Sequence, residues 1–342
     1  MLNWGIIGLG NVAQRFADAF KGQKNSQLIA ISSRDKNKLN YFKEKYQISD
    51  ECCHSNYQDI LNNKIVDILY IALPNHLHFE WILKVIDCQK NVLVEKPAVI
   101  NFKEIKEIKK KINLKKIFFS EGYMYRYQPQ IKKLIELIQN DKIGKLVSME
   151  SKFGNNILSK KKFLFFEKKK KIDAKDRLFD KDKGGGVILD LGCYPSSFTL
   201  LIARLNKELD IGNFELKNTK IEYGETGVDI DSYTEVSFSN KFLSKISASF
   251  KKNLGVDTKI IGTEGEIQIT NTWEGINSKL NIIGKNKEAF IFDENLNPYF
   301  YEIKEISECI LGNKKEIELP GVNFEETFFN TKILDSWINN EK

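Results

Sequence analysis

The chain lacks the long apolar run that a membrane protein needs. None of its 342 residues belongs to an uninterrupted apolar stretch near the ~20 residues of a membrane span, so we expect no membrane partner. The amino-terminal segment, MLNWGIIGLG, has neither a basic stretch nor a small-residue cleavage site, which argues against a signal peptide. Both observations favour a cytoplasmic protein.

Cysteine and histidine are also scarce, with five and three residues respectively. The cysteines form no CxxC pair and are scattered along the chain, at Cys52, Cys53, Cys88, Cys193 and Cys309. This distribution is typical of free thiols in a reducing cytosol. There is no HExxH-type set among the three histidines, and we therefore expect no metal site.

Negative charge is in slight deficit, because 53 Lys and Arg against 46 Asp and Glu give a net charge of +7. The densest positive charge lies in a lysine-rich insertion at 159–171, where phenylalanines stand between two lysine clusters. Such a segment can bind nucleic acid. No groove-reading motif accompanies it, so we expect a solvated loop and no nucleic-acid partner.

Composition and periodicity indicate an α/β protein of two domains. An apolar content of 42% is ordinary for a globular protein, and 342 residues exceed one typical core. In the first ~120 residues, short β-branched runs at 3–8, 28–33, 66–73, 92–94 and 117–120 alternate with amphipathic stretches at 12–21, 36–46, 76–87 and 102–111. This alternation predicts a doubly wound Rossmann parallel sheet with helices on both faces.

The rhythm changes after residue 126. A helix at 130–140 and a strand at 146–153 precede the lysine-rich loop, a glycine run and a helix at 190–205. Alternating strands then extend from 214 to 292, and helices at 299–310 and 323–337 close the chain. We expect a Rossmann domain at 1–122 and, at 123–342, an α+β domain with a large, mostly antiparallel open sheet. The last helices can pack back on the first domain.

The first strand leads into a dinucleotide-binding motif. In the sequence GxGxxA, Gly8 permits a tight turn, Gly10 lets the main chain approach a pyrophosphate, and Ala13 allows close packing of helix on strand. The following helix offers free N–H groups to the phosphates. The expected cofactor contacts in this turn are Gly8, Leu9, Gly10, Asn11 and Val12.

The end of the second strand selects between NAD and NADP. NAD-binding proteins usually place an acid there for the ribose 2′-hydroxyl, whereas this chain has Ser33 and Arg34. A guanidinium suits a 2′-phosphate, so we expect NADP as the cofactor. The alternative is that Arg34 is merely solvated and Asp35 accepts the 2′-hydroxyl of NAD.

Three further motifs follow predicted parallel strands and should meet at one edge of the sheet. The expected cofactor contacts in them are Leu73, Pro74, Asn75, His78, Glu95, Lys96 and Arg126. Lys96, whose main chain is fixed by a following proline, is well placed over a nicotinamide. His78 can instead be structural, and Arg126 can simply pair with an acid.

These motifs resemble the family of glucose–fructose oxidoreductase and inositol dehydrogenase (Gfo/Idh/MocA). The resemblance extends over nearly the whole chain through PNxxH, EKP, MxRxxP, the run GGGVILDLGCY at 184–194 and GVD at 227–229. Within the family, the SRD turn, ALPNxLH, MYR and DxGCYP are similar to NADP-dependent D-xylose dehydrogenases and dimeric dihydrodiol dehydrogenases. The lysine-rich insertion departs from these relatives and leaves the substrate open.

The resemblance implies that Lys96 and Tyr194 flank the reacting carbon. A tyrosine with a pKa near ~10 is a poor base unless a nearby cation favours its phenolate, which Lys96 can do. Asp190, one helical turn before Tyr194, can orient the pair or bind a substrate hydroxyl. The alternatives are that Tyr194 only packs and that Asp190 only caps a helix. Arg177 is a further candidate for a substrate contact.

The expected function is an NADP-dependent oxidoreductase that transfers a hydride between the cofactor and a sugar or polyol. Alternatives are a dihydrodiol or dicarbonyl oxidoreductase, and an NADP-binding sensor without turnover. We also expect a homodimer or homotetramer. In YTEVSF, Tyr233 does not point the same way as both Val236 and Phe238, which predicts an uncovered second sheet face that is still apolar.

Overall fold

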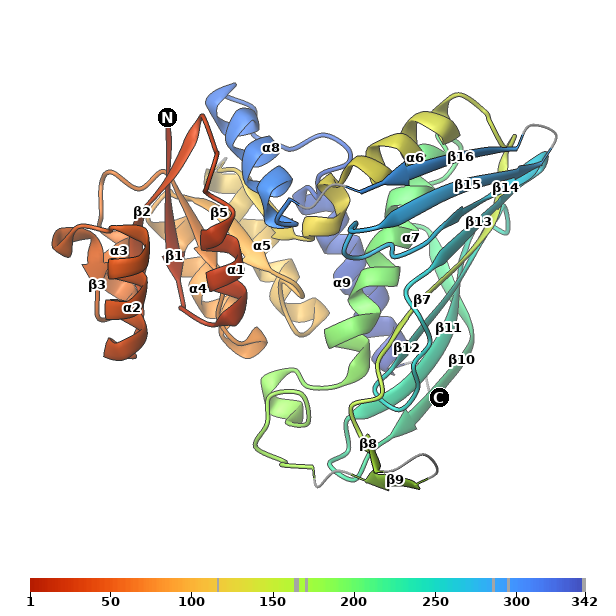
Figure 1. Ribbon diagram of the computed structural model, residues 1–342, viewed down its shortest axis with the longest axis horizontal. Coiled ribbons are helices and arrows are strands. Elements are labelled where there is room, and N and C mark those ends of the chain that lie inside the picture. The colour runs from red at the N-terminus through yellow and green to blue at the C-terminus, as the bar shows by residue number, and fades with distance from the viewer. Residues whose placement is uncertain (116, 163–165, 170–171, 285–286, 294–295, 340–342) are drawn as a thin grey trace. The chain divides into compact units, whose positions relative to one another are not determined.

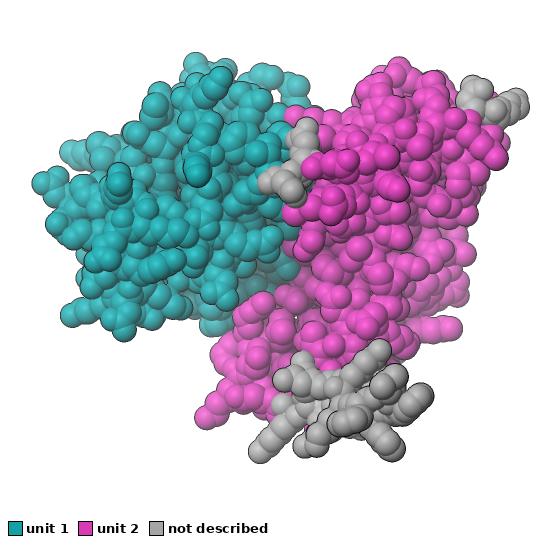
Figure 2. All heavy atoms as spheres, viewed as in Figure 1, with its two compact units in different colours: residues 1–128, 295–328 teal, residues 129–294, 329–342 magenta. Residues whose placement is uncertain are grey.

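The computed structural model describes residues 1–115, 117–162, 166–169, 172–284, 287–293 and 296–339. The chain forms two compact units (Figure 2). Unit 1 consists of Met1–Gln128 and Asn295–Phe328, and unit 2 of Pro129–Glu294 and Phe329–Lys342. Each unit therefore combines a long continuous segment with a shorter one from the carboxyl-terminal part of the chain.

Unit 1 is built on a six-stranded parallel sheet in the order β3-β2-β1-β4-β5-β6 (Figure 1). The strands are β1 (Leu2–Ile7), β2 (Ser26–Ser32), β3 (Cys53–His54), β4 (Ile68–Ile71), β5 (Asn91–Glu95) and β6 (Phe119–Gly122). Every neighbouring pair is parallel. All four residues of β4 are buried, as expected for a strand covered by helices on both faces. The predicted Rossmann architecture is confirmed.

Helices cover this sheet, and one of them comes from far along the chain. They are α1 (Asn11–Asp18), α2 (Lys36–Tyr46), α3 (Tyr57–Leu61), α4 (Asn75–Asp87), α5 (Phe102–Lys115) and α8 (Tyr299–Leu311). Phe16 of α1 stacks on Tyr70 of β4, with 3.8 Å between ring centroids. Trp4 of β1 donates a hydrogen bond of 3.0 Å from Nε1 to Ser307 Oγ of α8. The core of unit 1 is thus completed by a helix whose Ser307 lies 303 residues after Trp4 in the sequence.

Unit 2 contains an eight-stranded sheet in the order β10-β11-β12-β7-β13-β14-β15-β16. The strands are β7 (Leu146–Gly154), β10 (Phe214–Tyr223), β11 (Asp229–Phe238), β12 (Phe242–Ser249), β13 (Thr258–Gly262), β14 (Gly265–Ile269), β15 (Ser278–Gly284) and β16 (Glu288–Phe292). Only the β12–β7 pair among these is parallel, which confirms the mostly antiparallel sheet.

Helices α6 (Pro129–Gln139) and α7 (Cys193–Leu205) lie over one face of this sheet (Figure 1). A last helix, α9 (Phe324–Asn339), begins in unit 1 and ends in unit 2. By length and composition the stretch Lys181–Leu205 is apolar enough to cross a membrane. However, 94% of its most apolar window is buried in the protein, which is the behaviour of a core helix.

The other face of the sheet carries both charged and apolar side chains, since Ile283 of β15 and Ile291 of β16 are exposed on it. Val236 and Phe238 are both buried, whereas Tyr233 lies on the opposite face. On that face, cross-strand pairing aligns five residues from five strands: Lys217, Glu235, Lys245, Glu150 and Lys259. Opposite charges facing each other across strands stabilise a sheet in water. In β11, the strict alternation of strand side chains places Val236 and Phe238 on the face opposite to Tyr233 and Glu235.

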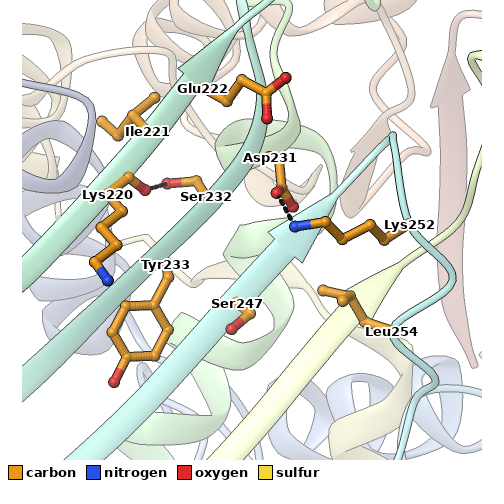
Figure 3. A pocket seen from close by; sticks show the side chains of 9 residues that line it. All are labelled: Lys220, Ile221, Glu222, Asp231, Ser232, Tyr233, Ser247, Lys252 and Leu254. Atoms are coloured by element: carbon orange, nitrogen blue, oxygen red, sulfur yellow. Dashed lines mark hydrogen bonds and ion pairs between the residues drawn. The ribbon is translucent and has the colours of Figure 1, made fainter.

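Figure 3 shows one end of this face. A hollow of about 320 Å³ lies there between β10, β11 and β12. Asp231 forms an ion pair with Lys252 at its rim, and Ser232 donates a hydrogen bond of 3.1 Å to the main-chain oxygen of Lys220.

The lysine-rich insertion, expected to be a loop, contains a short antiparallel hairpin of β8 (Ser159–Lys162) and β9 (Phe166–Lys169). Its residues 163–165 and 170–171 lie outside the described part of the chain. The hairpin pairing places Lys160 opposite Lys168. A run of lysines has no alternation of apolar and polar residues and therefore gives no strand signal in the sequence.

Candidate active site

The GxGxxA turn has the geometry of a phosphate cradle. Gly8 has φ +93°, and a Cβ there would lie 2.7 Å from the main-chain oxygen of Ala72, so only glycine fits. A Cβ on Gly10 would meet nothing within 4 Å, which leaves room above the turn. No side chain caps α1 at Gly10, and its first turn holds no acid. Its first N–H groups can therefore donate to an anion.

The remaining residues of this turn divide between packing and exposure. Leu9 is buried at 4% exposure and Ala13 is completely buried, in keeping with close packing of α1 on the sheet. Asn11 and Val12 are exposed on the first turn of α1. Of the predicted cofactor contacts in this turn, Asn11 and Val12 are therefore exposed, whereas the Leu9 side chain is buried.

The turn after β2 separates Arg34 from Asp35. The Asp35 carboxylate caps α2, accepting hydrogen bonds of 2.9 Å from Asn37 N and 3.2 Å from Lys38 N. Ser33 is buried, and its hydroxyl accepts a hydrogen bond from Asp35 N. Arg34 is exposed, with its guanidinium 4.9 Å from the ring centroid of Tyr57. The guanidinium therefore rests on an aromatic face while the neighbouring acid is engaged by its own helix.

The motifs that follow β4, β5 and β6 lie in a row, because these strands are neighbours and parallel. His78 ties two of the motifs together. Its Nδ1 lies 2.9 Å from the main-chain oxygen of Pro97, and its Nε2 lies 2.7 Å from that of Leu73. The side chain is fully buried, and burial lowers the pKa of His78 to about 4. In its neutral form the imidazole donates to one of these two carbonyls, and its enclosed ring braces both loops.

Glu121, at the end of β6, supports the same row. Its Oε1 accepts a hydrogen bond of 2.9 Å from Ala98 N, directly after the EKP motif. Burial raises the pKa of Glu121 to about 7. Around this framework, Lys96 and Asn75 are half-buried, Leu73 is buried, and Pro74 at the start of α4 is exposed. The structure thus brings the predicted residues of these loops to one edge of the sheet of unit 1.

A buried acidic cluster lies behind the EKP motif. The Tyr70 hydroxyl donates a hydrogen bond to Glu95 Oε1, and burial raises the pKa of Glu95. Glu302 of α8 is fully buried, and neither carboxyl oxygen has a hydrogen-bond partner among the described residues. Burial, together with the charge of Glu95, holds the pKa of Glu302 well above its usual range. That the charge of Glu95 acts on Glu302 was not predictable from the sequence, because Glu302 belongs to a distant helix.

Arg126 follows one of the two alternatives considered for it. Its guanidinium is completely buried and forms an ion pair with Glu326, while Nε donates a hydrogen bond of 2.9 Å to the main-chain oxygen of Pro320. All three residues belong to unit 1. The side chain pairs with an acid and ties the segment after β6 to the first turn of α9 and to the segment that precedes it.

In unit 2, the glycine run leads into a π-helical turn, Ile188–Gly192, before α7 starts at Cys193. The expected α-helical start at 190 is therefore replaced by a wider turn. Asp190 lies within this turn, where its Oδ1 is 3.4 Å from Arg177 Nη1. Since α7 is capped at Gly192 by no side chain, Asp190 does not act as its N-cap.

Tyr194 lies in the first turn of α7 and is 8% exposed. Its ring packs against Phe153, with 5.2 Å between centroids, and against Trp273, with 5.7 Å. These contacts fix the ring within unit 2. Asp190 and Tyr194 thus lie four residues apart on the π-helical turn and the start of α7. Arg177, on the loop before the glycine run, pairs with Asp190. π-Helical turns are rare and are frequent at functional sites.

Comparison with protein families matches both halves of the chain. Residues 2–123 match the oxidoreductase family with an NAD-binding Rossmann fold, and residues 131–268 match the Gfo/Idh/MocA C-terminal domain. The chain is 26% identical over 325 residues to trans-1,2-dihydrobenzene-1,2-diol dehydrogenase of Xenopus tropicalis, covering 92% of this chain and 90% of that protein. The human protein of the same name is 23% identical over 345 residues, covering 98% and 95%.

Solved structures share the fold over the same extent. An aldose-aldose oxidoreductase from Caulobacter crescentus superposes with a TM-score of 0.83 at 20% identity, covering 99% of this chain and 96% of that chain. A 3-ketoreductase from Actinomadura kijaniata, in complex with NADP and TDP-benzene, superposes with a TM-score of 0.80 at 19% identity, covering 98% and 96%. With both family domains present in order, the chain belongs to the Gfo/Idh/MocA family of NAD-binding Rossmann-fold oxidoreductases.

Proposed function

We propose that this protein is an NADP-dependent oxidoreductase that interconverts a hydroxyl and a carbonyl group on a sugar or polyol. The observation that carries the cofactor assignment is the different contacts of Arg34 and Asp35 after β2. The Asp35 carboxylate caps α2, whereas the Arg34 guanidinium is exposed and lies over the Tyr57 ring. A guanidinium suits a 2′-phosphate, and the acid that would accept a 2′-hydroxyl is engaged elsewhere.

The residues of unit 1 fit a dinucleotide. Main-chain N–H groups at the start of α1 would hold the pyrophosphate, with the open space above Gly10 admitting it. Arg34 would hold the 2′-phosphate. The loops after β4 and β5, braced by His78, would line the nicotinamide end. When bound, the nicotinamide accepts or supplies the hydride.

We assign the proton transfer to Tyr194 and Lys96. The Tyr194 phenol would take the hydroxyl proton during oxidation, and the Lys96 ammonium would favour the phenolate. Asp190 would accept a hydrogen bond from a substrate hydroxyl, with Arg177 setting its orientation. The aromatic packing of Tyr194 against Phe153 and Trp273 supports this assignment, because it holds the ring in one orientation.

A second candidate activity is the oxidation of trans-dihydrodiols or the reduction of dicarbonyls. It is favoured by the names of the relatives, which are dihydrodiol dehydrogenases over 90% or more of their length. Both activities use the same cofactor and the same residues, and they differ only in the substrate. A sensor that binds NADP without turnover is the third candidate, and retention of both Lys96 and Tyr194 argues against it.

The test is a panel of D-xylose, D-glucose, myo-inositol and trans-1,2-dihydrobenzene-1,2-diol, read through the absorbance of reduced cofactor. Lys96→Met should lower kcat by roughly 10²–10⁴ while NADP affinity stays within a few-fold. Lys64→Met, which removes an exposed lysine preceding β4, should match the wild type. Near-normal kcat in Lys96→Met contradicts the assignment. Tight NADP binding without turnover of any probe favours the sensor.

We further propose a homodimer or homotetramer in the cytoplasm. All five cysteines are free, which suits a reducing compartment. Exposed Ile283 and Ile291 on β15 and β16 support association through this face. A second copy offset along the charged row would add salt-sensitive ion pairs. Light scattering and cell fractionation test the two statements separately.

A further inference from the structure

A buried carboxylate at the start of β11 reaches the glycine run of unit 2. Asp229 is 6% exposed, and its Oδ2 accepts a hydrogen bond of 2.6 Å from Ile188 N. Ile188 is the first residue of the π-helical turn that contains Asp190 and leads into Tyr194. The carboxylate thus holds the main chain at the entrance of the turn, 41 residues away in sequence.

The glycine run is shaped to admit this carboxylate. Gly186 has φ +112°, and a Cβ there would lie 2.2 Å from Asp229 Oδ1. Both the backbone conformation and the close approach therefore require glycine. The neighbouring Gly185 is enclosed by the main-chain oxygens of Arg177, Leu178 and Asp180, which surround its missing Cβ at 2.8–2.9 Å. The glycine run therefore packs against the loop of Arg177 on one side and against the Asp229 carboxylate of β11 on the other.

A π-helical turn needs such external support. Its hydrogen bonds span one residue more than those of an α-helix, and the form is rare because the chain prefers α-helical geometry. Resting on the proposed function, we propose that Asp229 is a positioning residue: its carboxylate, through Ile188, holds the turn that aims Asp190 and Tyr194 at the substrate. Loss of its negative charge should therefore loosen the turn and lower turnover.

The pKa of Asp229 lies close to neutral pH. Burial raises the pKa of Asp229 to about 6, against the opposing effect of main-chain hydrogen bonds from Ile188, Asp229 itself and Val187. Two other carboxylates lie on the same elements, Asp190 in the π-helical turn and Asp231 in β11. Each is already in an ion pair, Asp190 with Arg177 and Asp231 with Lys252. Above about pH 6 the carboxylate accepts the Ile188 N–H with full charge. Below it, protonation removes that charge and weakens the bond.

Hydrogen–deuterium exchange of the full chain tests the anchoring without any substrate. After correction for the intrinsic pH dependence of exchange, protection of residues 186–192 should fall by roughly ten- to a hundredfold between pH 7.5 and pH 5, because a hydrogen bond to a charged acceptor is weakened. Asp229→Asn should have low protection at pH 7.5 and no transition. Asp231→Asn, two residues along the same strand, should behave as the wild type.

Kinetics then separate a positioning role from a merely structural one. For whichever probe substrate the wild type converts, kcat should decline below pH 6, and in Asp229→Asn it should be low and flat across this limb. NADP affinity, which depends on unit 1, should be unchanged. Protection that is independent of pH in the wild type and equal in Asp229→Asn overturns the proposal. Normal exchange behaviour without turnover instead counts against the proposed function alone.

Discussion

Replacing Arg34 by alanine tests the cofactor assignment most directly. The guanidinium is exposed and stands 4.9 Å from the Tyr57 ring, so a bound 2′-phosphate would gain a charge-assisted pair whose geometry is already set. Such pairs contribute about 1.5–3 kcal/mol. Because Arg34 is exposed to water and salt, the lower end applies. At about 1.4 kcal/mol per factor of ten, this corresponds to roughly a tenfold loss of affinity for NADPH.

The support from Tyr57 gives a second, smaller perturbation. Tyr57 in turn packs edge-on against Trp81, with 5.3 Å between centroids, which holds its ring in place. Exposed cation–π contacts contribute about 0.5–1 kcal/mol. Tyr57→Leu should therefore weaken NADPH binding by roughly two- to fivefold, whereas Tyr57→Phe, which keeps the ring, should not.

Isothermal titration calorimetry with NADPH and NADH at fixed ionic strength is the assay. Arg34→Ala should leave NADH affinity nearly unchanged, since NADH has no 2′-phosphate. The NADPH loss should shrink as salt is raised. Lys64→Ala, which removes one positive charge just before β4, controls for net charge. Equal losses for both cofactors, or a loss in the control as large as in Arg34→Ala, would refute the reasoning.

Three further predictions concern stability and assembly. Gly8→Ala should destabilise the fold by about 1–3 kcal/mol, measured by chemical denaturation, because φ is +93° and the Cβ meets the Ala72 oxygen. The raised pKa of Glu302 means that the native state binds a proton more tightly than the unfolded state, so the melting temperature should fall as pH rises above ~4.3. Glu302→Gln should reduce this fall, and an unchanged dependence of melting temperature on pH would contradict the prediction. Light scattering should give a multiple of 39.6 kDa that falls toward one chain in high salt, and a single-chain mass at every salt concentration would contradict it.

Local sequence pattern determined the architecture of both units and the position of the dinucleotide turn. Strand and helix periodicities are local properties, and the parallel and antiparallel sheets followed from them directly. The glycines of the GxGxxA turn were recognised because a positive φ and an open approach permit few other residues. The motifs after β4, β5 and β6 were expected together because parallel strands end at one edge. The assignment of Lys96, Tyr194 and Asp190 as catalytic residues rests on the resemblance and remains a prediction.

Only the tertiary structure decided what each polar side chain contacts. Whether Asp35 faces a ribose or caps α2, and whether Arg126 meets an acid, depends on groups placed by the fold. Glu302 lies in the field of Glu95 of the EKP motif, and Asp229 accepts a hydrogen bond from Ile188 after the glycine run, both from elements distant in sequence. The strict alternation of β11 was visible beforehand, but not which face the helices would cover. Hydrogen bonds and burial depend on distances in space, and a single sequence specifies those only through the packing of the whole chain.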